Sequence, residues 1–241
     1  MSIPFIDVHC HIIPGVDDGA GSIEEALELL RMEQQQGARE LILTPHYRRG
    51  YFETSRDTVE MQLEQLSQTA IRTGLAIPLH LGCEFYRINE MEGLLKKDGR
   101  YRMAGTRYVL LEFMPQDLAD TIWRCTGDLL LAGFRPVIAH AERYQALRNR
   151  SFLRRLLQAG AYIQINAGSI LGESGWGTKR FCKMLLKEGL VHFVGSDAHN
   201  RKGRVPCMGP CGEYLSKKLG NEEAKRLLLR NPEALLAGND L

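Results

Sequence analysis

Short runs of β-branched and other apolar residues alternate along the chain with longer segments in which apolar residues recur at helical spacing. The short runs predict about seven strands, over residues 4–9, 40–44, 77–82, 108–112, 135–139, 162–166 and 191–195. The longer segments predict helices over residues 23–36, 54–73, 118–132, 152–159, 179–188 and 221–229. This alternation is typical of repeated βα units around a parallel sheet.

Polar and glycine residues mark the ends of these elements. Ser22 and Glu25 form a capping box before the first helix, and Gly37 follows its last apolar residue. No linker or low-complexity tract interrupts the repeat, so we predict one α/β domain over residues 1–241. Closure into a (β/α)7 TIM-like barrel is the natural arrangement, and an open doubly wound sheet obeys the same local pattern.

Composition and charge narrow the classes of partner. The chain has 44% hydrophobic residues, and 31 Lys and Arg against 29 Asp and Glu give a net charge of only +2. This balance predicts a globular protein that does not bind nucleic acid. The N-terminus lacks a secretion signal, and no run of 18 apolar residues is present. We therefore expect a soluble, cytoplasmic protein without direct membrane insertion, and a homo-oligomer is left open.

Six cysteines are spread through the chain without the density of a disulfide framework. Cys207 and Cys211 form CMGPC, whose spacing fits neither a zinc ribbon nor a CxxC redox motif. We favour ordinary buried thiols here, with a redox or soft-metal role as the alternative.

Candidate metal ligands recur at one end of the predicted strands. These residues are His9, His11, Asp18, His46, Glu84, Glu112, His140, Asp197 and His199. The carboxyl ends of parallel strands lie on one face, so residues distant in sequence converge there. His and carboxylate are preferred ligands of Zn, Mn and Fe, and a multi-metal centre is therefore predicted.

Each ligand type also has a structural alternative. A single His at a strand end is more often a hydrogen-bonded structural residue, but two HxH or DxH pairs can each grip one ion. Glu84 and Glu112 end apolar strands, where a carboxylate needs a cation or an arginine; Arg107, Arg135 and Arg143 are the available arginines.

Four further polar residues are left outside the predicted ligand set. His80 and His192 lie away from the carboxyl ends of their strands and are interpreted as structural histidines. Asp7 is expected to support the HxH ligands, and Asp17 is assigned no role.

The charge of the predicted centre indicates an anionic substrate. Four ligand carboxylates would leave a site with three divalent ions net cationic. Clustered ions can lower the pKa of a bound water to about 7 and hold phosphoryl oxygens, so we expect a metal-bridging hydroxide to attack phosphorus. Arg143 and Arg204 are positioned to bind phosphoryl oxygens, with ordinary surface charge as the alternative. Arg48 and Arg49 are further substrate-binding candidates.

The motifs HCH, DDG, TPH, GCE, LLEF, AHAER, GSDAHN and NPEALL resemble those of the PHP (polymerase and histidinol phosphatase) superfamily. Within it, HIIPGVDDGA, AHAERY and GSDAHNRKGRVP resemble the bacterial manganese-dependent tyrosine phosphatases that control capsule and exopolysaccharide synthesis. The resemblance runs nearly end to end. It implies a distorted barrel with three metals, most often Mn, although Fe, Zn, Mg or Co are also accepted by such ligands.

The resemblance also implies a ligand assignment and a substrate. One metal is held by His9, His11, Glu84 and Asp197, a second by Glu84, Glu112 and His140, and a third by Asp18, His46 and His199. Arg143 and Arg204 match phosphate-binding positions. The implied substrate is the phosphotyrosine tail of a membrane-associated bacterial tyrosine kinase. Two alternatives are another phosphoesterase of the superfamily, such as histidinol phosphatase, and a non-catalytic phosphotyrosine- or metal-binding regulatory module.

Overall fold

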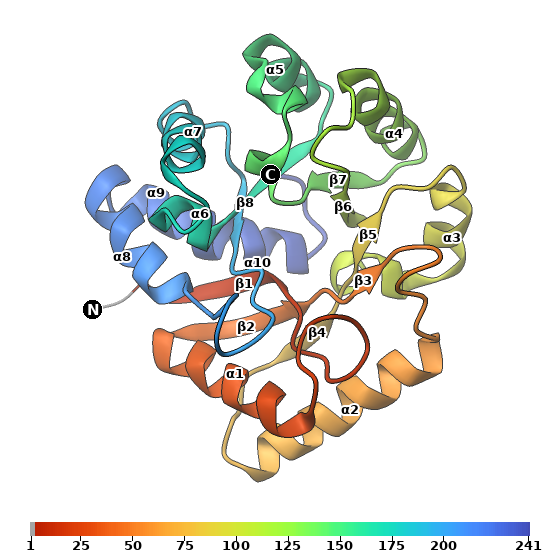
Figure 1. The fold of residues 1–241 in the computed structure, drawn as a ribbon, viewed down its shortest axis with the longest axis vertical. Helices are drawn as coiled ribbons and strands as arrows, with labels where there is room; N and C mark the ends of the chain where they lie inside the picture. Colours follow the sequence, from red (N-terminus) through yellow and green to blue (C-terminus); the bar gives the residue numbers. More distant parts are fainter. Residues whose placement is uncertain (1–2) are drawn as a thin grey trace.

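The computed structural model describes residues 3–241 and has a curled parallel sheet surrounded by helices (Figure 1). Its strands are β1 (Phe5–Cys10), β2 (Ala38–Leu43), β3 (His46–Tyr47), β4 (Leu79–Leu81), β5 (Glu84–Tyr86), β6 (Tyr108–Glu112), β7 (Arg135–Ile138), β8 (Tyr162–Asn166) and β9 (Phe193–Gly195). They form one sheet in the order β1-β2-β4 and another in the order β3-β5-β6-β7-β8-β9, with parallel pairing throughout.

Two of the predicted strands, 40–44 and 77–82, are each followed by a second short strand that the sequence did not predict. Pro45 separates β2 from β3, and Gly82 and Cys83 separate β4 from β5. Pro45 has no backbone N–H to donate, and a Cβ on Gly82 would lie 2.9 Å from Cγ2 of Ile42. With each such pair of strands taken as one, the described chain has seven strand positions, as a distorted (β/α)7 barrel requires. A bridge between Cys10 and Ala198 brings β1 beside the end of β9.

Helices cover the outside of the sheet. Figure 1 shows α1 (Ile23–Gln36) and α2 (Arg56–Arg72) on one side, with α4 (Ala119–Leu131), α5 (Arg150–Gln158) and α7 (Trp176–Lys187) on the opposite side. The remaining α-helices of the described chain are α3 (Met91–Lys97), α6 (Ala167–Leu171), α8 (Met208–Leu219), α9 (Asn221–Lys225) and α10 (Asn231–Leu236). Among residues 3–241, no helix is long and apolar enough to cross a membrane.

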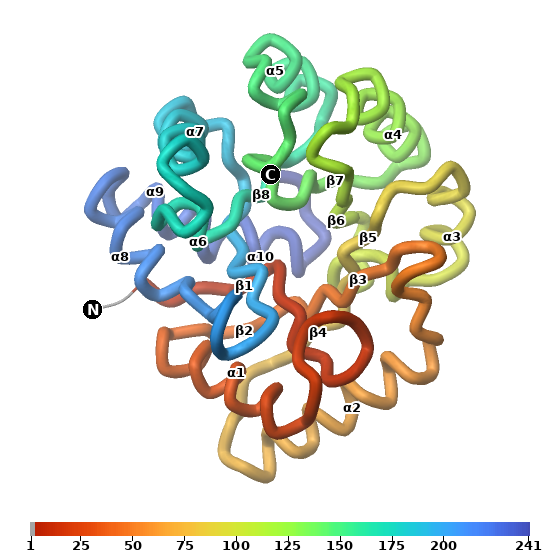
Figure 2. Tube along the Cα trace, in the orientation of Figure 1, coloured from red at the N-terminus to blue at the C-terminus, as the bar shows by residue number. Residues whose placement is uncertain are grey.

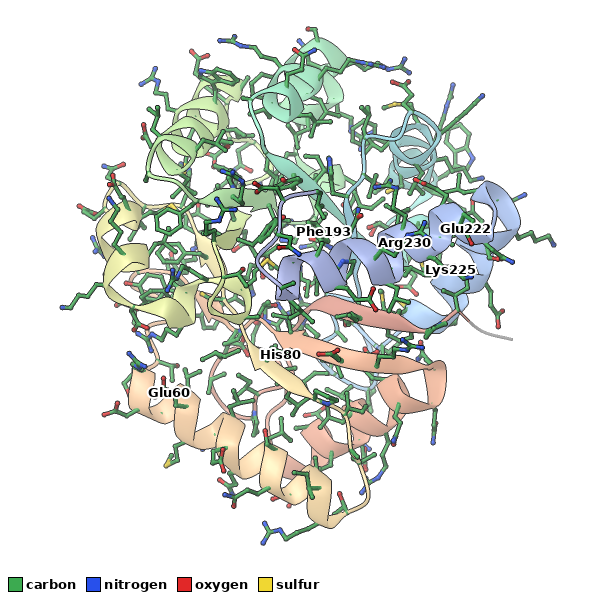
Figure 3. All side chains as sticks on the ribbon, turned by 180° about the vertical axis from the view of Figure 1, so that it is seen from behind. Glu60, His80, Phe193, Glu222, Lys225 and Arg230 are labelled. Carbon is green, nitrogen blue, oxygen red and sulfur yellow. The ribbon has the colours of Figure 1, made fainter. Side chains whose placement is uncertain are left out.

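Apolar side chains fill the interior below the carboxyl ends of the strands. This cluster includes Val8, Tyr108, Leu110, Val137 and Phe193, together with Leu235 of α10. Figure 3 shows Phe193 beside α10 when the molecule is seen from behind. The barrel is therefore a packed core with one open end, and the loops at that end carry the polar residues.

Several element boundaries differ from the predictions. The third predicted strand, 77–82, is replaced by β4 and β5, and the seventh, 191–195, begins only at Phe193. The predicted helix 221–229 is α9, followed by a π-helical turn over Arg226–Arg230 and then α10.

Helix α8 is missing from the prediction altogether, because Gly209, Pro210 and Gly212 lower its helix propensity. Gly209 is needed there since a Cβ would lie 2.9 Å from Cβ of Gln36. Tertiary packing against α1 thus decides the local structure.

Candidate metal centre

The nine predicted ligands meet at the carboxyl ends of the strands. Three groups of them offer ligand atoms that lie within 4.8 Å of one another: His9, His11, Glu84 and Asp197; His46, Glu84 and Glu112; and His11, Asp18, His46 and His199. Figure 2 shows how the loops after β1 and β9, which carry several of these residues, approach each other. Convergence of residues spread over 190 positions is what the parallel topology predicts.

The first group, called here the buried quartet, consists of His9, His11, Glu84 and Asp197. Nε2 of His9 and Nε2 of His11 each lie 3.2 Å from Oε2 of Glu84 and 3.6 Å from Oδ1 of Asp197. All four side chains are buried. The quartet therefore presents two nitrogens and two carboxylate oxygens to one point, which suits a borderline divalent ion.

Glu84 links the quartet to the second group. Its Oε2 lies 3.1 Å from Nδ1 of His46, and its Oε1 lies 2.6 Å from Nε2 of His140. Glu112 is near the same two rings, 3.7 Å from His46 and 3.8 Å from His140. His140 thus lies beside the carboxylates with which the resemblance associates it, and His46 approaches them as well.

Asp18 completes the third group from the loop after β1. Its Oδ1 lies 3.5 Å from Nε2 of His46 and 3.5 Å from Nε2 of His199. The His199 ring stacks on His11 at 3.9 Å between centroids. This group is the most open, because 45% of the Asp18 side chain is exposed.

Two buried atoms in the centre lack hydrogen-bond partners within the described chain. Oε2 of Glu84 and Nε2 of His199 are both buried, and neither atom takes part in a hydrogen bond. Three imidazole nitrogens surround the Glu84 oxygen without bonding to it. A buried polar atom without a partner is costly, and a cation would satisfy both atoms. The donor set therefore fits divalent metal ions.

The carboxylates repel one another in the absence of cations. Burial, together with the negative charge of Glu84, raises the pKa of Glu112 to about 8. Asp197 is also buried, but the charges of His9 and Arg143 hold its pKa below the ordinary value. Adding positive charge to the centre is therefore favourable.

Two of the candidate ligands adopt left-handed backbone conformations. His140 has a φ of 32° and Asp197 a φ of 55°, and each lies two residues after the end of a strand. Non-glycine residues in this conformation cost on the order of 1 kcal/mol or more. Both turns aim the side chains at the centre, so strain at these positions is linked to the site.

Neighbouring side chains hold the ligands in place. Asp7 accepts hydrogen bonds from the backbone of His9 and of Ser196, in agreement with its expected supporting role. Oδ2 of Asp17 lies 2.7 Å from Nδ1 of His11 and accepts a hydrogen bond from the backbone N–H of His46. Such contacts fix the orientation of ligand rings.

Strand β8 contributes a second supporting pair that the sequence analysis did not identify. Oε1 of Gln164 accepts a hydrogen bond from the His140 backbone and lies 3.2 Å from Nδ1 of His9. Asn166 donates to Oδ2 of Asp197 at 2.7 Å. The available signal was the alternation of polar Gln164 and Asn166 within the otherwise apolar run YIQIN.

The arginines separate into two sets. Arg143 donates to Oδ2 of Asp197 at 2.6 Å, and Arg204 to Oδ2 of Asp18 at 3.1 Å, so both lie at the centre. Arg107 and Arg135 instead pair with Asp240 next to the starts of β6 and β7. They are therefore not the partners of Glu84 or Glu112.

The two remaining substrate-binding candidates lie beside β3. The guanidinium of Arg48 lies 4.4 Å from the centroids of both the Tyr51 and the Tyr86 rings. Nη1 of Arg49 lies 3.2 Å from Oε2 of Glu90, and both of these side chains are more than half exposed.

The residues assigned structural roles are accounted for by their contacts. His80, labelled in Figure 3, pairs with Glu40 at 2.6 Å across the neighbouring strands β2 and β4. His192 bonds the backbone of Ile163. Cys10 packs in an apolar cluster against α1 and α2, away from the metal ligands as strand alternation predicts. Burial raises the pKa of Cys207 and Cys211, which disfavours their thiolate forms.

A distorted parallel barrel with clustered His and carboxylate side chains at its open end defines a metal-dependent hydrolase of the TIM-barrel class. The sequence matches the family model of capsular polysaccharide synthesis proteins CpsB/CapC over residues 5–237. The chain belongs to this family.

Individual relatives agree with this placement. The tyrosine-protein phosphatase YwqE of Bacillus subtilis is 38% identical over 235 residues, covering 94% of this chain and 92% of YwqE. The tyrosine-protein phosphatase CpsB of Streptococcus agalactiae is 33% identical over 237 residues, covering 96% of this chain and 98% of CpsB. A crystal structure from a study of YwqE of B. subtilis and CpsB of Streptococcus pneumoniae, described as metal-dependent tyrosine phosphatases, superposes with a TM-score of 0.91 at 35% identity. That match covers 98% of this chain and 96% of the other.

Proposed function

We propose that this protein is a metal-dependent protein-tyrosine phosphatase that acts in capsule or exopolysaccharide synthesis. The observation that carries the proposal is the converging donor set around Glu84, which would hold divalent ions in a chain closely related to tyrosine phosphatases. Residues 1–241 would act as one phosphatase domain.

Three divalent ions are proposed for the centre. His9, His11, Glu84 and Asp197 would hold one, and Glu84, Glu112 and His140 a second. Asp18, His46 and His199 would hold the third. Manganese is the proposed native metal, although ligands of this kind also accept Fe, Zn, Mg or Co. When bound, such ions activate water as a nucleophile and neutralise phosphoryl oxygens.

The arginines of the centre are proposed to bind and orient the phosphoryl group. Arg143 and Arg204 already lie beside metal-ligand carboxylates, and a planar guanidinium can donate two parallel hydrogen bonds to a phosphate. In substrate binding, each would exchange its carboxylate contact for phosphoryl oxygens. Arg48 and Arg49 lie farther out and are proposed to contact the substrate beyond its phosphoryl group.

Phosphotyrosine is a chemically suitable substrate for this centre. The phenolate leaving group has a conjugate acid with a pKa of about 10, so it needs less protonation than an alkoxide. We propose the phosphorylated tail of a membrane-associated bacterial tyrosine kinase as the substrate, with dephosphorylation in the cytoplasm. The protein itself would need no insertion into the membrane, and assembly into a homo-oligomer is compatible with this role.

Metal analysis combined with a substrate panel tests the proposal. We expect the purified protein to contain divalent metal and to hydrolyse phosphotyrosine peptides and p-nitrophenyl phosphate, with loss of activity on chelation and recovery on metal addition. His9→Ala should lose metal and activity together. Faster hydrolysis of histidinol phosphate than of phosphotyrosine peptides would show that the substrate assignment is wrong. Metal-loaded protein without phosphatase activity would indicate a non-catalytic binding module. Retained metal and activity in His9→Ala would refute the proposed centre.

A further inference from the structure

A cluster of aromatic and cationic side chains lies directly outside the metal centre. It consists of Arg48, Tyr51, Phe52 and Tyr86 and is called here the aromatic cluster. The Arg48 guanidinium contacts the faces of two tyrosine rings at 4.4 Å, and the Phe52 ring stacks on His46 at 5.2 Å between centroids. Nothing in the metal-binding chemistry requires these aromatic residues.

The pairing of β3 with β5 explains why the cluster lies next to the metal ligands. His46 pairs with Glu84 and Tyr47 with Phe85, so the next position along the two strands brings Arg48 beside Tyr86. Residues two apart in a strand share a face, and therefore Arg48 follows His46 and Tyr86 follows Glu84. The Cα atoms of these layers are about 6–7 Å apart.

Tyr47 and Phe85, between these positions, face the other way. Their rings pack on each other at 4.9 Å and on Tyr101, in the core between the sheet and its covering helices. Two faces of the same strands thus have separate tasks: one packs against the helices, and the other lines the open end of the barrel.

The loop that carries the cluster is held in one conformation. Arg48 and Phe52 exchange two backbone hydrogen bonds, at 2.9 and 2.8 Å, and Gly50 supplies the left-handed turn with a φ of 79°. The backbone N–H of Gly50 also donates to Glu53. Because these backbone hydrogen bonds hold the loop, we expect little conformational entropy to be lost when a ring packs on it.

We infer that the aromatic cluster is an aryl-binding subsite, in which the Arg48–Tyr86 pair receives the phenyl ring of an aromatic phosphomonoester whose phosphoryl group lies at the metal centre. The inference rests on the proposed function and names the residues that select an aryl over an alkyl substrate. One bridging oxygen separates phosphorus from the phenyl ring, which places the ring in the layer just outside the ligands.

The chemistry of the cluster matches an aromatic ring better than an aliphatic chain. Aromatic rings pair favourably through offset or edge-to-face contacts, and a guanidinium is attracted to the face of an aromatic ring. Tyr51 is 74% exposed, so part of the cluster is open to an incoming ligand. An alkyl phosphate would gain neither interaction.

Binding of phenylphosphonate and methylphosphonate to the manganese-loaded protein, measured by isothermal titration calorimetry, tests the subsite without turnover. We expect wild type to prefer phenylphosphonate, and Tyr86→Leu to reduce the ratio of the two affinities by roughly fivefold to tenfold. Tyr86→Phe should keep the preference because the ring is retained. Arg48→Met provides a second variant, with a loss of roughly threefold to fivefold in the same ratio.

A matched control removes a cation–aromatic pair elsewhere. Arg155 lies 3.9 Å from the centroid of the Trp123 ring on the helical shell, and Trp123→Leu should leave the affinity ratio as in wild type. Equal affinities for the two phosphonates in wild type would overturn the inference, as would an unchanged ratio in both Tyr86→Leu and Arg48→Met. Failure to hydrolyse phosphotyrosine peptides would refute the proposed function separately, since the affinity ratio still reports on the subsite.

Discussion

The buried quartet and the outer side of the same metal centre differ in their access to water. The side chains of His9 and Glu84 are 0% and 1% exposed, whereas those of Glu112 and Asp18 are 19% and 45% exposed. Asp18 and Glu112, together with His46, form what is called here the outer trio. The quartet is supported by Asp7, Gln164 and Asn166, but a loop alone carries Asp18.

This difference predicts a graded response to the loss of a ligand. Buried charges interact strongly, and water cannot replace a missing partner there. At the outer trio, water can enter and complete the coordination of an ion. The quartet should therefore decide whether metal binds at all, and the outer trio should adjust how tightly one ion is held.

Replacement of Glu84 should have the largest effect, because its two oxygens approach four imidazole rings. Glu84→Gln keeps the shape but removes the charge, and we expect kcat/KM to fall on the order of a thousandfold, about 4 kcal/mol of transition-state stabilisation. Atomic emission spectroscopy should show metal loss from the same sample. Glu40→Gln, which affects only the contact with His80, is the control. Full metal content in Glu84→Gln would contradict the proposed difference between the buried quartet and the outer trio.

Asp17 connects the two regions, since it contacts the His11 ring and the His46 backbone. We expect Asp17→Asn to lower metal affinity by roughly 10- to 100-fold through loss of ligand orientation. Competition with a metal-sensitive dye measures this affinity, and the exposed Asp57→Asn on α2 serves as the matched control. An effect no greater than that of Asp57→Asn would limit Asp17 to a structural role.

Substitution in the outer trio should reduce kcat/KM less than substitution in the buried quartet. Asp18→Asn is expected to reduce kcat/KM by roughly tenfold, and excess manganese should restore most of the activity because a water can take the vacated position. Activity titrated against manganese gives the result. A loss of activity that excess manganese does not restore would show that exposure does not separate the two regions.

The last effect concerns the stability of the metal-free protein and not its activity. Burial and Glu84 raise the pKa of Glu112 to about 8, so its contribution to stability is fully present below pH 4.5 and is lost as pH rises towards 8. Glu112→Gln should remove this dependence of the unfolding free energy on pH between pH 5 and 8. Urea unfolding of chelator-treated wild type and variant at both pH values measures it. The same change in unfolding free energy with pH in wild type and Glu112→Gln would contradict the expected repulsion between Glu112 and Glu84.

The sequence predicted the convergence of the nine candidate ligands better than the details of the strands that carry them. Strands β6 and β8 have the predicted limits, and all nine candidate ligands meet at one end of the barrel. The breaks at Pro45 and at Gly82 were not predicted, because they depend on contacts between neighbouring strands.

The supporting residues were harder to predict than the ligands. Gln164, Asn166 and Asp17 act through partners distant in sequence, so their roles follow only from the three-dimensional arrangement. Candidate ligands can be recognised from the sequence because they are His, Asp or Glu residues at the ends of strands. A supporting amide such as that of Gln164 resembles any other polar residue in a strand.

The left-handed conformations of His140 and Asp197 have a consequence for engineering. Glycine and asparagine adopt this conformation more readily than histidine or aspartate. A screen for thermal tolerance alone, performed without metal, would therefore favour Gly or Asn at positions 140 and 197. Such variants would be more thermostable but inactive, so directed evolution of this protein must select for turnover and thermal stability together.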